Sequence, residues 1–466
     1  MTLALVGHFW TAGPRDFVPT WNDEIIYWNE IATFARAGFH GGYITAYERP
    51  ARFDASRFGP HGPVFAATVG SLVRVPGWQP YSGFVVNLVV ITLAAAVWVF
   101  ALPRDVSAAV AALALATFWP FLIYLPSNMQ EPWHFAIALA FAALLPRVRP
   151  GAAAWAAIVL IVVSAMLRPT WALLTVPVFW ALLPRVKWIA LPAGVVATGA
   201  AYAVFSWLAA PFPNSLNALI DRARVSPLSA LTIGAASAAG NVRLFFTPTH
   251  GEVPEVLLRG EVIAALAACA IFYRRAPRTA TEVSLVLAPI VAAVIGAGWV
   301  ESWRDFRSVA PMLLVATLVA GARHPRVLRA AGVVNLCLLP AVLPTFVRLH
   351  EPRFKISPIE IRRFGEAVRP YLQFRPDATG WENTVLAQVD TIQYPLLGLP
   401  RGFGISFVIE WEDQQMPPRS RYLLLRRVDV DQLPRTLRLT PLVETSAGTL
   451  YRNEAIAPAT SAAGSW

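Results

Sequence analysis

Long apolar runs follow one another through the middle of the chain, and they constrain its fold more than any other feature. A helix needs about 20 residues to cross the roughly 30 Å hydrocarbon layer of a membrane. The chain is 56% hydrophobic and only 14% charged, whereas soluble domains have roughly 25% charged residues. The sequence therefore favours a bilayer as its solvent. The apolar runs lie near residues 81–101, 106–125, 132–145, 152–167, 170–184, 188–210, 256–273, 280–300, 307–322 and 328–348.

Positive charges gather in every second connection between these runs. Those connections hold eleven basic residues and one acid, Asp105, whereas the others are balanced in charge. Cytoplasmic loops of membrane proteins carry an excess of Lys and Arg. The pattern therefore places residues 11–80 and residues from 349 onward outside the cytoplasm. It also explains the net charge of +11 as an insertion signal, so nucleic acid is not expected as a partner.

These features predict a mainly α, polytopic membrane protein of 10 or 11 transmembrane helices with a small α+β extracytoplasmic C-terminal domain. Residues 1–10 span about 15 Å as a helix, so we expect a truncated first transmembrane helix there. Residues 11–80 form an outer segment. Residues 81–348 form the membrane domain, with a partly ordered outer loop at 211–255. Residues 349–466 form the outer domain, with strands expected in GISFVIEW, RYLLLRRVDV and RTLRLTPLV.

The outer segment contains two amphipathic stretches, WNDEIIYWNEIATFARAGF and HGPVFAATVGSLVRV, which we interpret as helices along the outer membrane surface. The first begins with adjacent carboxylates, Asp23 and Glu24, flanked by Trp21, Tyr27 and Trp28. One interpretation is a general base beside aromatic platforms suited to sugar rings. The other is a helix cap with an acid that compensates the helix dipole.

Arg168 lies between two runs of about 16 and 14 residues, which reach roughly 24 and 21 Å as helices. Because both are too short to cross a bilayer fully, the tip of this hairpin should lie below the outer surface, inside the protein. A charge there is usually paired or functional. The alternative is a single arginine whose side chain extends to the interface.

A second group of cations occurs in ESWRDFRSVAP, where Arg304 and Arg307 are three residues apart. If the following helix begins here, both can point toward one anionic group. The alternative is a solvated loop with internal ion pairs of low energetic value.

Two further pairs are weaker candidates for substrate binding. Glu131 and His134 lie three apart at the start of a short helix. One carboxylate and one histidine do not make a metal site, and a capping role for Glu131 is an open alternative. Arg57 and His61 lie in RFGPHGP, where Gly and Pro predict a tight connection whether or not His61 does chemistry.

The order of these features resembles the GT-C glycosyltransferase superfamily. The shared layout is a D-E pair in the first outer segment, a surface helix, a GPHGP-type turn, a second surface helix, many short-looped helices and an outer C-terminal domain. The resemblance covers nearly the whole chain in layout but few residues in motif. Similar members transfer sugars from polyprenyl-phosphate carriers on the outer face of the membrane, with an acid of the first loop as catalytic base. The shortened first helix departs from that pattern.

The resemblance implies Asp23 as the base, with Glu24 as the neighbour that could share or replace it. It implies Arg168, Arg304 and Arg307 as cations near the donor phosphate. Tyr27 is added to the weaker substrate-binding candidates. No cofactor is required where arginine supplies the charge, and a divalent metal stays an open alternative.

The expected function is an inverting transfer of sugar from a polyprenyl-phosphate donor to an envelope glycan, lipid or protein. The expected place is a bacterial cytoplasmic (inner) membrane, with the active site and the C-terminal domain facing the periplasm or exterior. The chief alternative is an envelope polysaccharide or lipid transporter, flippase or polymerase without this base chemistry, which would place charges along the middle of several helices. A membrane scaffold whose tail binds a partner is a third interpretation.

Overall fold

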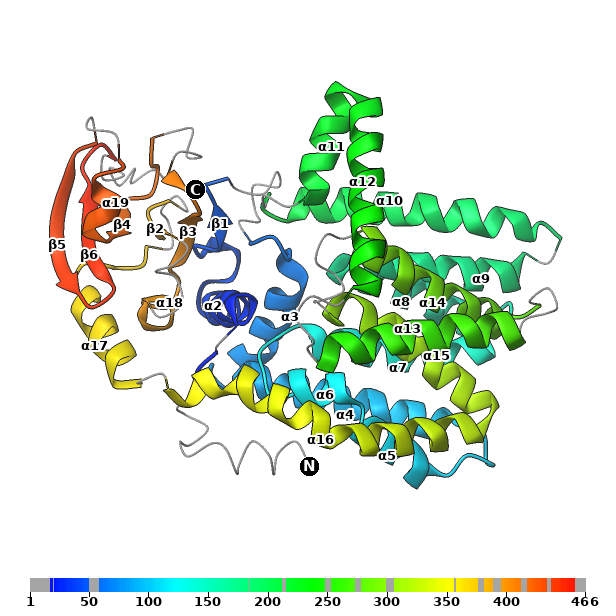
Figure 1. Ribbon diagram of the computed structural model, residues 1–466. Coiled ribbons are helices and arrows are strands. Elements are labelled where there is room, and N and C mark those ends of the chain that lie inside the picture. Colours follow the sequence, from blue (N-terminus) through cyan, green and yellow to red (C-terminus); the bar gives the residue numbers. More distant parts are fainter. Residues whose placement is uncertain are drawn as a thin grey trace.

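The computed structural model has two parts, a helical part and a part built around a mixed β-sheet (Figure 1). The truncated first helix expected at residues 1–10 lies outside the described residues. The structure describes residues 17–19, 21–49, 58–183, 185–211, 215–247, 253–272, 278–298, 306–355, 358–375, 381–388, 395–411, 417–433 and 437–456.

The helical part is formed by helices that follow the apolar runs of the sequence. They are α4 (Ser82–Ala101), α5 (Ala108–Ala116), α6 (Trp119–Tyr124), α7 (Glu131–Leu144), η3 (Leu145–Arg147), α8 (Ala152–Leu167), η4 (Pro169–Leu174), α9 (Thr175–Leu182), η5 (Lys187–Ile189), α10 (Ala190–Leu208), α13 (Val253–Phe272), α14 (Ala280–Gly298), α15 (Phe306–Arg323) and α16 (Pro325–Lys355).

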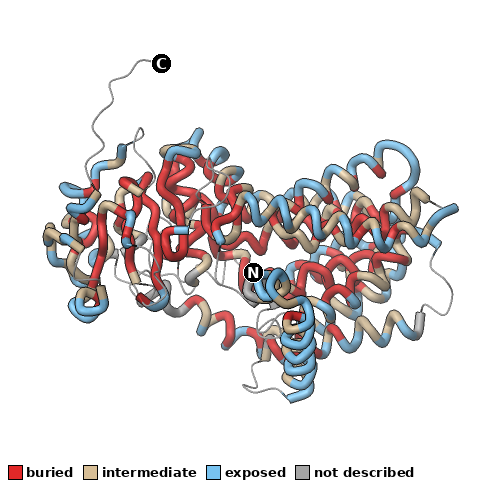
Figure 2. The backbone as a smooth tube through the Cα atoms, turned by 90° about the horizontal axis from the view of Figure 1, so that it is seen from above, coloured by how far each residue is buried: buried red, intermediate tan, exposed pale blue. Residues whose placement is uncertain are grey.

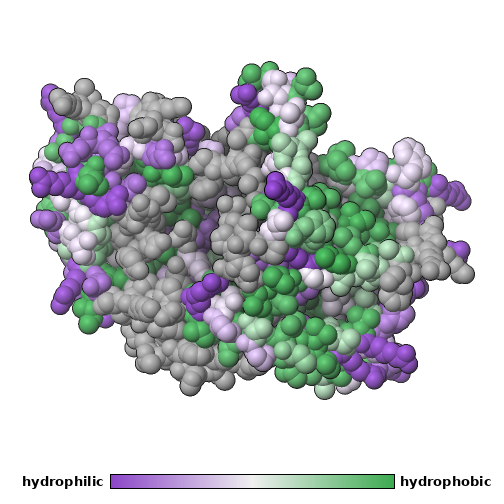
Figure 3. Space-filling view, viewed as in Figure 1, coloured by the Kyte–Doolittle hydropathy of each residue, from purple (hydrophilic) through white to green (hydrophobic). Residues whose placement is uncertain are grey.

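Four of the described helical segments are long and apolar enough to cross a membrane: Ser82–Ala101, Lys187–Leu208, Ala280–Gly298 and Pro325–His350. Their outward faces are apolar, as on α4, where Val85, Val89, Leu93 and Val97 are all exposed. Apolar residues cover much of the helical part in the space-filling view, whereas hydrophilic residues gather on the other part (Figure 3). An apolar surface of this kind is typical of a protein surrounded by lipid.

Two of the expected spans are broken into shorter pieces. The run at 106–125 forms α5 and α6, and the run at 170–184 forms η4 and α9. Pro120 stands in the first turn of α6 and separates it from α5, whereas Pro169 begins η4, which continues into α9 without a gap. Proline fits the first turn of a helix but interrupts a continuous one, because it has no amide proton to donate.

The partly ordered loop expected at 211–255 is wrong for much of its length. The structure has a helical hairpin there, α11 (Ser215–Val225) and α12 (Pro227–Phe246), which projects from the other helices (Figure 1). Ser226 caps α12 by accepting a hydrogen bond from the amide of Ser229, and Pro227 occupies the first helical position. Serine followed by proline thus begins a helix here rather than marking a loop.

Two contacts join segments that the charge pattern assigns to the same side of the membrane. Arg147 donates to the Ala101 carbonyl at 2.6 Å, which joins two connections predicted to be cytoplasmic. The ring of His350 contacts the Ile123 carbonyl at 2.9 Å, which joins two ends predicted to be outer. Both contacts are therefore consistent with the sides that the charge pattern gives these segments.

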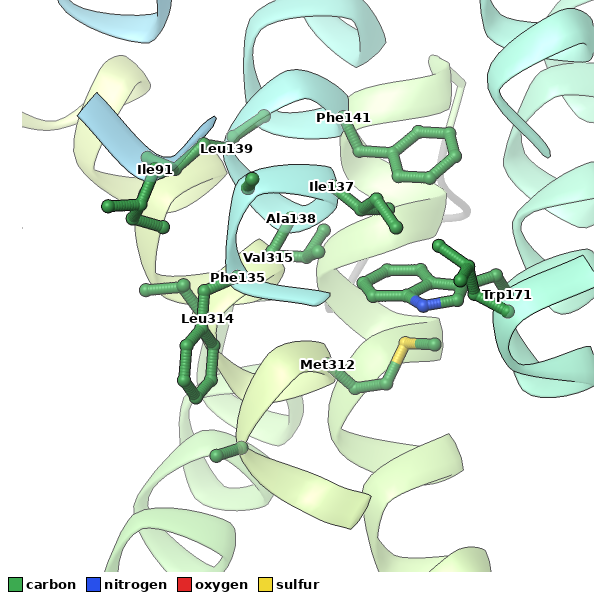
Figure 4. Packing of buried hydrophobic residues seen from close by; sticks show 14 of the residues in the cluster. Ile91, Phe135, Ile137, Ala138, Leu139, Phe141, Trp171, Met312, Leu314 and Val315 are labelled. Atoms are coloured by element: carbon green, nitrogen blue, oxygen red, sulfur yellow. The ribbon is translucent and has the colours of Figure 1, made fainter. Parts of the chain in front are cut away.

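The inner surfaces of the helices pack tightly around α7 and α15. Figure 4 shows Phe135, Ile137 and Phe141 of α7 facing residues of α15 such as Met312. Trp171 of η4 stacks on Phe141, with ring centroids 5.6 Å apart. This core fixes the start of α7 relative to the start of α15, and both starts carry candidate site residues.

The second part is a six-stranded sheet in the order β1-β3-β2-β4-β6-β5. β1, β3, β2 and β4 pair in parallel, and β4, β6 and β5 pair antiparallel. The inner strands read as continuous buried runs, as expected for parallel strands covered on both faces. The strands are β1 (Thr45–Ala46), β2 (Thr384–Gln388), β3 (Gly404–Val408), β4 (Tyr422–Leu425), β5 (Leu439–Thr445) and β6 (Gly448–Asn453).

The sequence prediction found three of these strands and missed three. RYLLLRRVDV also contains a helix after its strand, α19 (Arg427–Val430). β1 comes from the first outer segment, so residues 45–46 and the C-terminal region build one sheet. Two further helices, α17 (Pro358–Val368) and α18 (Pro395–Gly398), belong to this part.

The two amphipathic stretches form α2 (Asn22–Ala37), followed by η2 (Gly38–His40), and α3 (Pro63–Arg74). α2 is largely buried because it contributes to both cores. Ile25 and Ile26 join the core of the sheet, whereas Tyr27 and Ile31 join the core of the helical part. Buried backbone runs through the middle of both parts (Figure 2). α2 is thus the helix that fixes the sheet against the helical part.

Candidate active site

The first turns of α2 and α15 meet in an ion pair. Asp23 does not cap α2, because the helix begins after Trp21 and has no side-chain cap. Its Oδ2 instead accepts a hydrogen bond from Nη1 of Arg307 at 2.6 Å. The two side chains are 28% and 27% exposed. The pair joins residues 284 positions apart, and solvent or a ligand can reach it.

His61 approaches the other oxygen of the same carboxylate. Its Nε2 lies 3.8 Å from Asp23 Oδ1, and its ring packs against Tyr27 with centroids 4.8 Å apart. The turn before α3 brings it there, and Gly62 adopts a φ of 72° in that turn, a conformation that favours glycine. The GPHGP turn therefore has a defined role, which is to place His61 beside Asp23.

These neighbours control the charge of Asp23. Burial alone would raise the pKa of its carboxyl, but the hydrogen bond and charge of His61 and the charge and hydrogen bond of Arg307 outweigh burial. Together they hold the pKa of Asp23 below its usual range. Asp23 is therefore ionised at neutral pH in this arrangement.

A second ion pair lies next to the first. Nη2 of Arg168 is 3.5 Å from Oε1 of Glu131, and the two side chains are 20% and 3% exposed. Nη1 of the same guanidinium donates to the backbone carbonyl of Arg307 at 3.0 Å. Arg168 is therefore paired and partly buried, and the alternative of a single arginine reaching for the interface is wrong.

Tyr27 lies within the field of both ion pairs. Burial raises the pKa of its phenol well above the usual value, and the charges of Glu131 and Asp23 raise it further, while Arg307 and Arg168 act in the opposite direction. The phenol stays neutral at physiological pH. Tyr27 is 1% exposed, and its ring packs against His61 and Phe65.

His134 is fully buried one turn into α7. Its Nδ1 accepts a hydrogen bond from Trp171 Nε1 at 3.1 Å. Among the residues that the structure describes, no group of three or more His, Cys, Asp or Glu could hold a metal ion.

Glu24 has a different environment from its neighbour Asp23. It is fully buried, and its Oε1 accepts a hydrogen bond from the amide of Asn128 at 2.8 Å. It ties α2 to the loop before α7. Of the adjacent carboxylates, Asp23 is the one that faces the arginines.

Two candidates, Arg57 and Arg304, lie outside the described residues. The sequence analysis also missed a residue of this region, Glu30. Its side chain is 1% exposed, and its Oε1 accepts a hydrogen bond from the amide of Gly59 at 2.7 Å. Glu30 and Asp23 are seven positions apart, which places both on one face of α2, and that spacing was the available signal in the sequence.

No known family model matches the chain, and no curated protein sequence matches it significantly. The chain is similar to two solved structures of ArnT from Cupriavidus metallidurans, one in the apo state and one bound to undecaprenyl phosphate. The TM-scores are 0.42 and 0.40, the identity is 13%, and each comparison covers 98% of both chains. Values this low do not support a function, which must come from the geometry of the site.

Proposed function

We propose that this protein is a membrane glycosyltransferase that moves a sugar from a polyprenyl-phosphate donor to an envelope glycan, lipid or protein acceptor, with inversion at the anomeric carbon. The observation that carries the proposal is the contact between Asp23 and Arg307, flanked by His61 and by the Arg168–Glu131 pair. An ionised carboxylate and two guanidinium groups meet at helix ends that are predicted to face the outer membrane surface.

The residues have complementary roles in such a transfer. The acceptor hydroxyl attacks the anomeric carbon and gives its proton to Asp23, while the bond from that carbon to the phosphate oxygen breaks. The departing lipid phosphate gains negative charge, which Arg307 and Arg168 stabilise. Attack opposite the leaving phosphate gives inversion, because the new bond forms on the other face of the sugar.

The ion pair also accounts for how Asp23 becomes a base. While it is bound to Arg307, its low pKa makes it a weak proton acceptor. A donor phosphate competes for the same guanidinium, since arginine binds phosphate as well as carboxylate. As Arg307 turns to the phosphate, one of the two groups that lower the pKa of Asp23 is withdrawn, so that pKa rises although His61 still lowers it, and the carboxylate is released for the acceptor. Donor binding thereby prepares the base.

The chief alternative, a transporter, flippase or polymerase, would use charges along the middle of several helices. The charged residues of this site instead lie at helix starts: Asp23 on α2, Glu131 on α7 and Arg307 on α15. That placement supports chemistry at one surface rather than a path through the membrane.

The test is an in vitro transfer assay with the purified chain, a panel of polyprenyl-phosphate sugars and an envelope extract as acceptor, with the anomeric configuration of the product determined. We expect one donor to give an inverted product with the wild type and none with Asp23→Asn. Asp221→Asn is the matched control, because Asp221 pairs with Arg224 on an exposed helix. Translocation of an intact donor across proteoliposomes without transfer would support the alternative instead.

A further inference from the structure

A cavity of about 350 Å³ lies on the other side of α2, between α2, α17, α18 and the turn at residues 78–80. α2 lines it with Trp28, Asn29, Ala32 and Thr33. At 100° per residue Trp28, Asn29 and Ala32 point more than about 90° away from Asp23 around the helix, and neither Asp23 nor its partners line the cavity. The cavity is therefore separate from the site proposed for transfer.

The cavity is strongly basic. Arg362, Arg369 and Arg401 line it, and the guanidinium of Arg401 lies 4.5 Å from the ring centroid of Trp78. Burial lowers the pKa of Arg401, and the charge of nearby Arg36 lowers it further. The positive charges of Arg36 and Arg401 repel each other. An anionic ligand in the cavity would compensate this repulsion.

No acid on the described part of the chain neutralises these arginines through an ion pair. α17 carries Glu360 and Glu366, but neither lines the cavity. The wall itself is fixed by a backbone contact between α17 and α18, where a Cβ on Gly365 would come within 2.6 Å of the Gly398 carbonyl oxygen. The positions of the arginine backbones are therefore set by packing rather than by a charge partner.

A polar side chain faces the same space from within the protein. Asn29 is 5% exposed, and its Oδ1 has no hydrogen-bond partner among the described residues. Leaving a buried amide oxygen unpaired is unfavourable, and a ligand hydroxyl would supply the missing hydrogen bond. The remaining wall is apolar, with Phe17, Leu397 and Leu399.

We propose that this cavity binds the headgroup of an anionic membrane phospholipid, with the phosphate on Arg369 and Arg401 and a headgroup hydroxyl on Asn29. A lipid is favoured over a free phosphate because α17 follows directly on α16, whose Pro325–His350 segment is apolar enough to cross a membrane. The apolar wall then receives the glycerol and the first carbons of the chains. This site is distinct from the proposed transferase chemistry and does not depend on it.

The proposal can be tested by measuring binding of dioctanoyl phosphatidylglycerol to the full chain in a mild detergent. We expect wild type to bind this lipid at least tenfold more tightly than dioctanoyl phosphatidylcholine, which has the same chains but no net charge and no hydroxyl. The double variant Arg369→Ala/Arg401→Ala should lose at least tenfold in affinity. Asn29→Asp should also weaken binding, because it adds a negative charge to a cavity proposed to bind an anionic headgroup.

The matched control is Arg363→Ala, which removes the same charge from an exposed position of α17 that does not line the cavity. It should bind phosphatidylglycerol like the wild type, and so should Asp23→Asn. An equal loss in Arg363→Ala, or equal affinity for the two lipids, would overturn the proposal. Displacement of the lipid by inorganic phosphate at the same concentration would also overturn it, because the phosphate alone would then be the ligand.

Discussion

Asp23 and Glu30 lie on one face of α2, two turns apart, and the protein gives the same chemical group opposite states at the two places. Asp23 is 28% exposed and pairs with Arg307, so the pKa of its carboxyl is held below the usual range. Glu30 is 1% exposed, and burial raises its pKa to about 7 despite its backbone hydrogen bonds. The cations around Asp23 keep its carboxyl ionised and available for reaction. Burial of Glu30 favours its protonated form, which has a structural role.

The contrast between Asp23 and Glu30 should have its largest effect on the rate of sugar transfer. Asp23→Asn should lower transfer by roughly 10²–10⁴-fold, which is the usual contribution of a general base. Glu30→Gln should change it only a few-fold, because the amide oxygen can still accept from Gly59. Initial rates at saturating donor measure both variants. Similar losses in the two, or normal turnover in Asp23→Asn, would end the assignment of Asp23 as the base.

A smaller effect is expected on donor binding. Hydrogen bonds to charged groups are worth about 1.5–3 kcal/mol, so Arg307→Ala should weaken donor affinity by roughly tenfold to a hundredfold, and Arg168→Ala should act in the same direction. Asp23→Asn should bind the donor as well as or better than wild type, because Arg307 loses its competing carboxylate.

The matched control for the donor experiment is Arg323→Ala, which removes an ion-paired arginine from the other end of the same helix. Equilibrium binding of a fluorescent polyprenyl-phosphate sugar gives the affinities. If Arg323→Ala and Arg307→Ala weakened binding equally, the effect would belong to the helix rather than to the site.

The smallest effect is on stability, and its sign follows from the raised pKa of Glu30. The folded carboxyl keeps its proton up to about pH 7, whereas the unfolded one loses it near 4.5. Between these values the folded state binds more protons at Glu30, so the contribution of Glu30 to stability is greatest below pH 4.5 and falls as pH rises to about 7. This rise in the pKa of Glu30 corresponds to roughly 3 kcal/mol in the free energy of unfolding. The thermal midpoint should therefore fall by a few degrees as pH rises from 5 to 7.

Glu30→Gln should reduce this fall in the thermal midpoint between pH 5 and 7, and the part that remains belongs to other buried carboxyls such as Glu48. Asp23→Asn should leave the fall in place, because Asp23 stays ionised across that range. A wild-type midpoint that is flat over the same interval would show that Glu30 is ionised in the folded protein.

Much of the helical part could be predicted from the sequence, because apolar length and charge bias are local properties. The helices α2 and α3 and most of the apolar segments appear where these patterns indicate. Local patterns were less reliable at prolines, since Pro120 divides one expected span and Pro227 begins α12 where a loop was expected. They also missed β1, because a two-residue strand exists only through its pairing with β3.

For the candidate site, too, some features could be predicted from the sequence and others only from the structure. The sequence by itself determined that Arg168 and Arg307 are charges at the ends of apolar helices, since the cost of placing charge in lipid restricts where such residues can stand, and that Asp23 lies at the start of an amphipathic helix. Only the tertiary structure decided that Asp23 meets Arg307 across 284 positions, that Arg168 pairs with Glu131, and that Glu24 and Glu30 are buried. Those outcomes depend on how helices distant in the sequence pack together, and packing sets the exposure and the neighbours on which the charge of each carboxylate depends.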